Sequence, residues 1–355
     1  MRLGRHIRVG SFVGSAAALL FFSLVIAPGA TAQFNEETRS VTKRGTTAAE
    51  FLSIPVGARA TAMGNAYSAS VDDASAIYWN PSGLAAMEKG AFSAEYATWL
   101  ADINFNYAAV VLPTGMGTFG LGVTALRSPE MEVTTVDEQM GTGERFTASS
   151  YAFSLSFGRN LTDRFALGAT AKVVNERIWH SSATGVALDI GTMFETPFRG
   201  IRLGASISNF GTKLRMSGDD LLSIIDIDPN NRGNNESNRA MLSTDRFDMP
   251  LTMRIGIAGE LFQSGGQRLT LAVDALSPNN SEQYVNAGME VGLLGDLVML
   301  RAGYSELFLE DSIRSFSLGG GLQYRFGPLD VAFDYAYEAQ KYFDGVNRFN
   351  FTVLF

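Results

Sequence analysis

The sequence predicts an all-β fold: a 14-stranded antiparallel transmembrane β-barrel with an N-terminal hatch inside its lumen. Three observations predict it. From residue 91 onward, short segments alternate large apolar residues with small or polar ones; the connections between them alternate short and long; and the chain ends on an aromatic residue. Alternation with period two is typical of a sheet with two different faces.

The first 32 residues are predicted to be a signal peptide rather than part of the fold. Arginines near the start give a positive region, an apolar stretch follows over 11–26, and Ala30-Thr31-Ala32 supplies the small residues before a cleavage site. The alternative, a membrane anchor, is disfavoured because the apolar stretch is short for a spanning helix and ends at Pro28-Gly29. We expect residues 33–45 to form a periplasmic N-terminal tail.

Charge and cysteine content narrow the possible functions. Loss of the three arginines of the signal takes the formal charge from −8 to −11. This balance argues against nucleic-acid binding, because phosphate contacts need clustered Lys and Arg. The chain has no cysteine, which excludes a lipoprotein, disulfides and thiolate metal sites. No mature segment has the roughly 18 apolar residues of a membrane helix, so a membrane crossing must use strands.

The alternating segments place one apolar row on each strand. A soluble sandwich also alternates, but it turns its apolar rows inward, whereas a transmembrane barrel turns them to lipid. Alternation alone does not separate the two. Between the apolar positions lie small or polar residues and charges, which include Asp334. We expect most of these charges to pair with one another in the lumen: Lys172, Asp189, Arg202, Arg254, Asp274, Arg301 and Arg325.

The connections favour the barrel. Short ones, such as 113–117 and 327–328, alternate with longer ones, such as 127–145, 178–183 and 211–249. Short turns on one rim and long loops on the other are typical of a barrel whose short turns face the periplasm. The count is 14 strands, an even number, as closure with both ends on one side requires. The first long-side connection, 100–103, is short and departs from the pattern.

The last strand supports this interpretation. Phe349, Phe351, Val353 and Phe355 form one face, and the chain stops on Phe355. This pattern resembles the C-terminal signal that the barrel-assembly machinery reads. We therefore expect that machinery to be a partner and the cell outer membrane to be the location.

Between residues 46 and 90 the alternation disappears. About forty residues of this kind are too many for a periplasmic stub and too few for a domain. They fit as a plug inside the barrel that residues 91–355 are expected to form. We expect Asp72 to cap a short helix, and Pro81 and Gly83 to force a turn in which Gly83 adopts a conformation closed to most residues. The residues expected to fasten this hatch by hydrogen bonds or salt bridges are Arg59, Asn65, Asp72, Asp73, Trp79 and Asn80. Contact of Asp72 and Asp73 with a ligand is the alternative.

These residues carry a family resemblance. Gly-Ala-Arg-Ala over 57–60, Met-Gly-Asn-Ala-Tyr over 63–67, and Tyr-Trp-Asn-Pro-Ser-Gly-Leu-Ala over 78–85 resemble the hatch of the PorV/PorQ family. That family is a branch of the FadL-type outer-membrane barrels, which have 14 strands. The resemblance covers residues 48–355 and is sharpest over 55–85.

The resemblance implies two alternative functions. PorV-type members serve the type IX secretion system, where they bind the C-terminal signal domains of secreted proteins and escort them from the translocon. FadL-type barrels instead pass hydrophobic molecules passively across the outer membrane, which makes a lipid or hydrophobic ligand the alternative partner. The first function is our main prediction. A possible cargo-facing loop holds Leu221, Leu222, Ile224 and Ile225, although packing onto the barrel rim is the alternative.

An enzyme is not expected. Outer-membrane hydrolases need a histidine base paired with Ser or Asp, and the only mature histidine is His180, beside Ser181 and Ser182 in a predicted loop. A nucleophile next to its base in sequence is rarely presented to it. No catalytic residue, metal ligand or cofactor is therefore predicted.

Overall fold

A computed structural model describes residues 43–231, 233, 235 and 237–355. The predicted signal peptide and residues 33–42 of the predicted tail lie outside the described residues. Among the residues that are described, no helix is long and apolar enough to cross a membrane.

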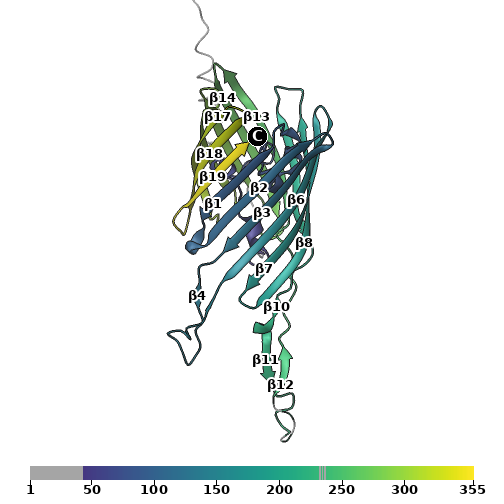
Figure 1. The fold of residues 1–355 in the computed structure, drawn as a ribbon, viewed down its shortest axis with the longest axis vertical. Helices are drawn as coiled ribbons and strands as arrows, with labels where there is room; N and C mark the ends of the chain where they lie inside the picture. The colour runs from purple at the N-terminus through teal and green to yellow at the C-terminus, as the bar shows by residue number, and fades with distance from the viewer. Residues whose placement is uncertain (1–42, 232, 234, 236) are drawn as a thin grey trace, which may run out of the picture. The chain divides into compact units, whose positions relative to one another are not determined.

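Fourteen antiparallel strands close into a barrel (Figure 1). The ring is complete because β1 pairs with both β2 and β19, and β8 pairs with β9. The strand count agrees with the sequence prediction. The fourteen strands are β1 (Ala91–Thr98), β2 (Asn104–Thr114), β3 (Gly117–Arg127), β6 (Ala148–Thr162), β7 (Phe165–Ile178), β8 (Ser181–Glu195), β9 (Arg202–Gly211), β13 (Thr252–Ser264), β14 (Gln267–Pro278), β15 (Tyr284–Leu293), β16 (Val298–Leu307), β17 (Arg314–Phe326), β18 (Leu329–Gln340) and β19 (Val346–Leu354).

The apolar rows face outward. On β7, Leu167 and Val173 are 41% and 49% exposed, whereas Thr170 and Lys172 are buried. The same alternation runs along the neighbouring strands and leaves a belt of exposed apolar side chains around the wall. This is the reverse of a soluble sandwich and the arrangement of a barrel in lipid.

The two rims differ as predicted. The short-turn rim carries two-residue turns such as 115–116 and 265–266, together with both ends of the barrel. The long-loop rim carries 128–147, with the hairpin β4 (Met131–Glu132) and β5 (Arg145–Phe146), and 212–251. The second loop contains β10 (Ser217–Gly218), η4 (Asp219–Leu221), and the hairpin β11 (Leu222–Ile225) and β12 (Asn238–Met241), which projects beyond the barrel (Figure 1).

One predicted long loop is wrong. Residues 178–183 do not form a loop, because β7 and β8 are joined by the two-residue turn Trp179-His180. Ser181 and Ala183 belong to β8 and face inward, where both are buried. Small and polar residues are what the inner face of this wall carries, so the start of β8 has no apolar signal in the sequence.

Residues 46–90, which we call the N-terminal segment, run from one rim to the other. They form η1 (Glu50–Ser53), α2 (Ala58–Ala62), α3 (Ala76–Trp79) and η2 (Pro81–Ala86); a further short helix, η3 (Leu100–Asp102), lies in the β1–β2 loop. Just before the segment, Arg44 donates to the carbonyls of Glu310 and Asp311 on the long-loop rim. The described end of the predicted periplasmic tail thus lies at the rim opposite to the expected one.

Candidate functional site

The N-terminal segment packs against the inner face of the wall. Its apolar side chains are almost fully buried, and they form one core with inward residues of β2. This core includes Val56, Met63, Ile77, Trp79 and Leu84 of the segment with Phe105, Tyr107 and Val111 of the strand. Because these wall residues face inward, the segment lies against the inner face of the barrel.

The end of the segment lies against glycines. Five inward glycines leave the space that α3 and η2 fill, and we call this group the glycine wall: Gly120 and Gly122 of β3, Gly158 of β6, Gly168 of β7 and Gly191 of β8. A Cβ on Gly168 would lie 2.2 Å from the carbonyl carbon of Pro81, and one on Gly158 would lie 2.7 Å from its oxygen. The backbone of η2 therefore rests directly on the backbone of the sheet.

Asn80 ties this contact together. Its side-chain oxygen accepts from the amide and the hydroxyl of Ser82, which caps η2, with Pro81 in the first helical position. Its amide nitrogen donates to the carbonyls of Ser68 at 2.9 Å and of Thr192 in the wall at 3.1 Å. One side chain thus joins the helix start, the segment and the barrel.

Gly83 differs from its prediction. It lies inside η2, not in a turn, and its φ is not positive. Glycine is required there for space, because a Cβ would lie 2.7 Å from the Cγ1 and the carbonyl oxygen of Val71.

Other predicted fastening residues divide into two groups. Asn65, at a φ of 61°, donates to Ser305 and Glu338 of the wall, both at 3.0 Å. Trp79 instead donates its indole N–H to the carbonyl of Val56, within the segment. Asp73 accepts the amide of Ser75 and the hydroxyl of Tyr67, so it also acts locally. Of these side chains, only that of Asn65 bonds to the barrel.

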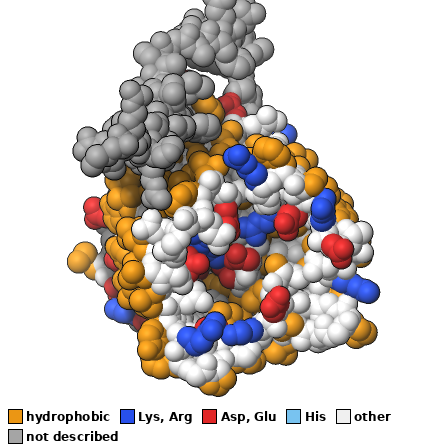
Figure 2. Space-filling model, turned by 90° about the horizontal axis from the view of Figure 1, so that it is seen from above, with side chains coloured by type: hydrophobic (Ala, Val, Ile, Leu, Met, Phe, Trp, Pro, Cys, Tyr) orange, Lys and Arg blue, Asp and Glu red, His pale blue; other side chains and the backbone are white. Residues whose placement is uncertain are grey.

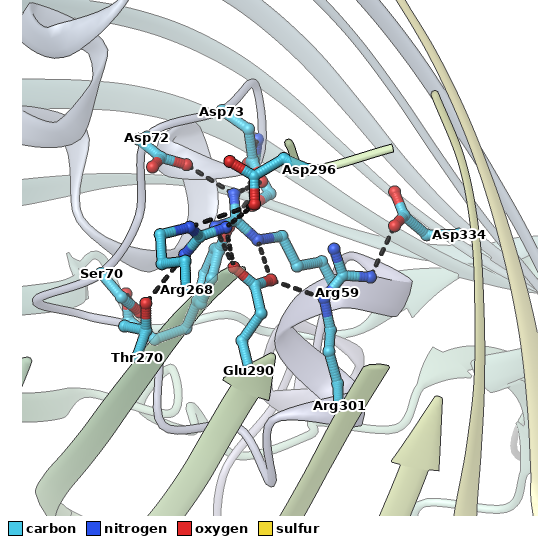
Figure 3. Close-up of polar contacts among 12 residues, drawn as sticks. Arg59, Ser70, Asp72, Asp73, Arg268, Thr270, Glu290, Asp296, Arg301 and Asp334 are labelled. Carbon is cyan, nitrogen blue, oxygen red and sulfur yellow. Dashed lines mark hydrogen bonds and ion pairs between the residues drawn. The ribbon is translucent and has the colours of Figure 1, made fainter. Parts of the chain in front are cut away.

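Arg59 of α2 faces a different wall. Its guanidinium donates to both carboxylate oxygens of Glu290 on β15, at 2.9 and 3.1 Å, and to Asp72 at 2.6 Å (Figure 3). Asp72 is therefore an ion-pair partner and not the helix cap that we expected. A second carboxylate, that of Asp73, lies 3.8 Å from the same guanidinium.

Glu290 is the centre of this network. Arg268 on β14 donates to it at 2.8 Å and Arg301 on β16 at 2.6 Å, so three guanidinium groups share one fully buried carboxylate. Arg301 also pairs with Asp334 on β18 at 2.6 Å, and Arg268 with Asp296 in the β15–β16 turn at 3.1 Å. We call Arg268, Glu290, Arg301 and Asp334 the charged wall.

The sequence prediction singled out Arg59 and Asp72, and it placed Arg301 and Asp334 among the charges between the apolar positions, but it missed Glu290 and Arg268. A signal was present, because Glu290 stands between the apolar Met289 and Val291 in the alternation.

Two cavities open beside this network at the short-turn rim. One, of about 270 Å³, extends toward Ser93 of β1 and Asn350 of β19. The other, of about 250 Å³, extends toward Arg202 of β9 and Glu260 of β13. Figure 2 views the molecule from the end opposite the β11–β12 hairpin and shows acidic and basic side chains gathered in a hollow.

The remaining predicted residues are not part of this network. Phe349, Phe351 and Phe355 are exposed on the outer side of the barrel end, with Val353 half-buried between them. Ile224 is 68% exposed on β11, where Leu222 and Ile225 are also exposed, and Leu221 at the end of η4 is half-buried. Neither placement tests their predicted roles in assembly and cargo binding, which stay predictions.

His180 does not form a catalytic arrangement with its serine neighbour. The hydroxyl of Ser181 donates to Asp220 at 2.9 Å, and the imidazole Nδ1 of His180 lies 3.0 Å from the same carboxylate. Loss of water contact acts to raise the pKa of Asp220, but hydrogen bonds from Ser181 and His180 outweigh this and hold it below its ordinary value. The group anchors the long loop to the β7–β8 turn.

Comparisons with known proteins agree with this architecture. The model of an uncharacterised protein family, UPF0164, matches residues 25–193, slightly less than half of the chain. None of the curated proteins matches the sequence.

Solved structures match over most of the chain. A FadL homologue of Pseudomonas aeruginosa has a TM-score of 0.52 at 13% identity, covering 85% of this chain and 98% of its own. The toluene transporter TodX of Pseudomonas putida has a TM-score of 0.53 at 14% identity, covering 84% and 97%. The monoaromatic hydrocarbon channel CymD has a TM-score of 0.55 at 15% identity, covering 84% and 96%.

At these identities the similarity establishes the fold. The wall supplies the second argument, since a closed barrel with an exposed apolar belt and a polar interior is stable in a bilayer and not in water. The chain is an outer-membrane β-barrel with the fold of the 14-stranded FadL-type barrels.

Proposed function

We propose that this barrel lets hydrophobic small molecules cross the outer membrane and that the N-terminal segment is its hatch. The observation that carries the proposal is a 14-stranded barrel whose lumen holds an apolar segment packed on inward apolar residues. Similar structures are described as a toluene transporter and a monoaromatic hydrocarbon channel. For this barrel, passage of such hydrocarbons is part of the proposal.

The contacts of the segment support a hatch that moves in part. Phe105, Tyr107 and Val111 of β2 offer an apolar surface that is covered by the segment. A hydrophobic molecule that displaced part of this cover would replace one apolar contact with another, at little cost in exposed apolar area. A polar solute would gain no such contact.

The escort role in type IX secretion was our main prediction, and the comparisons support the transport alternative better. The resemblance to PorV/PorQ hatches rests on segment residues such as Asn80 and Pro81, which contact the wall and one another. These contacts serve a plugged barrel of either kind. We therefore propose transport and keep no second function.

The test is uptake of toluene by cells that lack other barrels of this fold. Cells that make the protein should accumulate labelled toluene faster than cells carrying the empty vector, while uptake of a sugar stays unchanged. Assembly of the barrel is verified by heat-modifiable migration in detergent. Equal toluene uptake with and without a correctly assembled barrel would contradict the proposal.

A further inference from the structure

The ion network divides the short-turn rim. Both cavities at this rim are lined by the same five charged residues, Arg59, Asp72, Arg268, Glu290 and Asp296, and they diverge on either side of them. Figure 3 shows the side chains of Arg59 and Arg268 converging on Glu290 between the segment and the strands. The link between Arg59 and Glu290 therefore forms part of a partition between the two cavities.

The partners of each charge allow this link to break without leaving a buried charge alone. If Arg59 moved away, Glu290 would keep Arg268 at 2.8 Å and Arg301 at 2.6 Å. Arg59 would keep Asp72 at 2.6 Å and Asp73 at 3.8 Å, both in the segment. An unpaired buried charge is the main cost of breaking such a pair, and here neither side incurs it.

A second anchor shows the contrast. Asp274 of β14 is fully buried, and one of its oxygens accepts the backbone amides of Tyr67 and Ser68 at 2.9 and 2.8 Å. Its other oxygen has no hydrogen-bond partner in the described structure. Displacing residues 67–68 would take both donors from a buried carboxylate, so this part of the segment is fixed.

Movement at this link is confined to the Arg59 side chain. The end of α2 is held, because the amide of Gly64 donates to the hydroxyl of Ser317 at 3.0 Å and a Cβ on Gly303 would lie 2.1 Å from that amide nitrogen. The Arg59 side chain is 21% exposed and that of Glu290 is 1% exposed, so water reaches the link from the Arg59 side. An arginine side chain has several rotatable bonds, so it can turn away from Glu290 while α2 and residues 67–68 stay in place.

We propose that Arg59 and Glu290 form a detachable latch at the periplasmic mouth. In the open state Arg59 leaves Glu290, stays with Asp72 and Asp73, and merges the two cavities into one wider entrance. The inference deepens the proposed hatch function and rests on it for its biological meaning. Its test does not depend on which solute passes.

The test uses a single cysteine, since the chain has none. Ser93→Cys lies in the larger cavity and replaces a buried side chain. N-ethylmaleimide is small enough to enter either cavity, whereas fluorescein maleimide needs the wider entrance. The ratio of the two labelling rates, large reagent over small, measures the open state and cancels differences in cysteine reactivity.

In the Ser93→Cys background, Arg59→Gln should raise this ratio about tenfold, which corresponds to about 1.4 kcal/mol of latch free energy. In the protein with Arg59 intact, 1 M salt should raise it by less, because the Debye length falls to about 3 Å but a pair with one buried partner is screened less than an exposed pair. The matched control is Lys89→Gln, which removes the rim pair with Asp330 at 2.7 Å outside both cavities. That variant should leave the ratio unchanged.

Assembly is verified by heat-modifiable migration in detergent. If Arg59→Gln does not assemble, Arg59→Lys replaces it; a point charge cannot bridge two carboxylates as a guanidinium does, so a smaller rise is expected. An unchanged ratio in the assembled variant would overturn the latch, as would an equal rise in Lys89→Gln. A raised ratio without toluene uptake would uphold the latch and reject the proposed transport function.

Discussion

The glycine wall and the charged wall hold the same segment by different physical means. On the glycine wall, η2 touches the sheet backbone directly, and a single added Cβ would clash with Pro81 at Gly168. On the charged wall, the partly exposed Arg59 meets the buried carboxylate of Glu290 through side chains alone. Close backbone packing has no substitute, whereas an ion pair can exchange partners.

This difference separates a fixed backbone from a movable side chain. Residues 76–86 are seated on β3, β6, β7 and β8, so their release would open voids along four strands. Residues 58–62 also pack on β16, β17 and β18, but the Arg59 side chain belongs to a network whose charges stay paired in either state. We infer that a hatch in this barrel opens from the charged side.

The largest effect is expected at the centre of the charged wall. Glu290→Ala leaves Arg59, Arg268 and Arg301 without their shared carboxylate and should cost about 3–5 kcal/mol of unfolding free energy. Urea unfolding in lipid vesicles measures it, with Asp296→Ala as the control at a carboxylate that is 47% exposed. A loss below about 1 kcal/mol would mean that the network contributes little to stability.

The next effect tests which face of the barrel strands points to lipid and which points to the lumen. Leu318 on β17 is 51% exposed to lipid, and Leu318→Arg should cost about 2–4 kcal/mol if it lies near the bilayer midplane. Gln323→Arg on the same strand points into the larger cavity and should be tolerated. Equal loss of heat-modifiable folding in both variants would mean that the two faces are assigned the wrong way round.

A smaller effect is expected on the glycine wall. Gly168→Val places a side chain against the backbone of Pro81 and should cost about 1–3 kcal/mol through overpacking. Gly115→Val, at a turn glycine with nothing within 4 Å of its Cβ position, is the control. If vesicle unfolding is unchanged by Gly168→Val, η2 is not seated on this wall.

The smallest effect lies outside both walls. The pKa of Asp220 is held below its ordinary value of 3.8 in the folded loop, so its contribution is present above that pH and is lost as the pH falls through the folded value. Proteolysis of the 212–251 loop should therefore speed up in strong acid. The loop of the Asp220→Asn variant should be cleaved faster at neutral pH, and its cleavage should not accelerate further in acid. A persistent acceleration in acid would mean that another group is responsible.

The sequence predicted the barrel because each strand carries its own local signal. Leu167 and Val173 indicate the outward row of β7 from the sequence of that strand alone, and the same holds for the other strands. The start of β8 failed because Ser181 and Ala183 match the polar inner row. Local alternation therefore predicts strand number better than strand ends.

The site was predicted only in part, because its contacts depend on register. Arg59 and Asp72 stand out within a short segment, but their partner Glu290 is 231 residues from Arg59 in the chain. Nothing local indicates that β14, β15 and β16 bring Arg268, Glu290 and Arg301 to one level of the wall. Gly83 was predicted to adopt a conformation closed to most residues, but its φ is not positive, and the structure requires glycine there for space.

The central claim is that the N-terminal segment closes the lumen. The most direct measurement is the conductance of single barrels in a planar bilayer, for the full chain and for a variant lacking residues 46–78. The variant should assemble, shown by heat-modifiable migration, and conduct several-fold more than the full chain, since a 14-stranded barrel without a plug leaves an aqueous passage. An assembled variant that conducts no better than the full chain would contradict the claim.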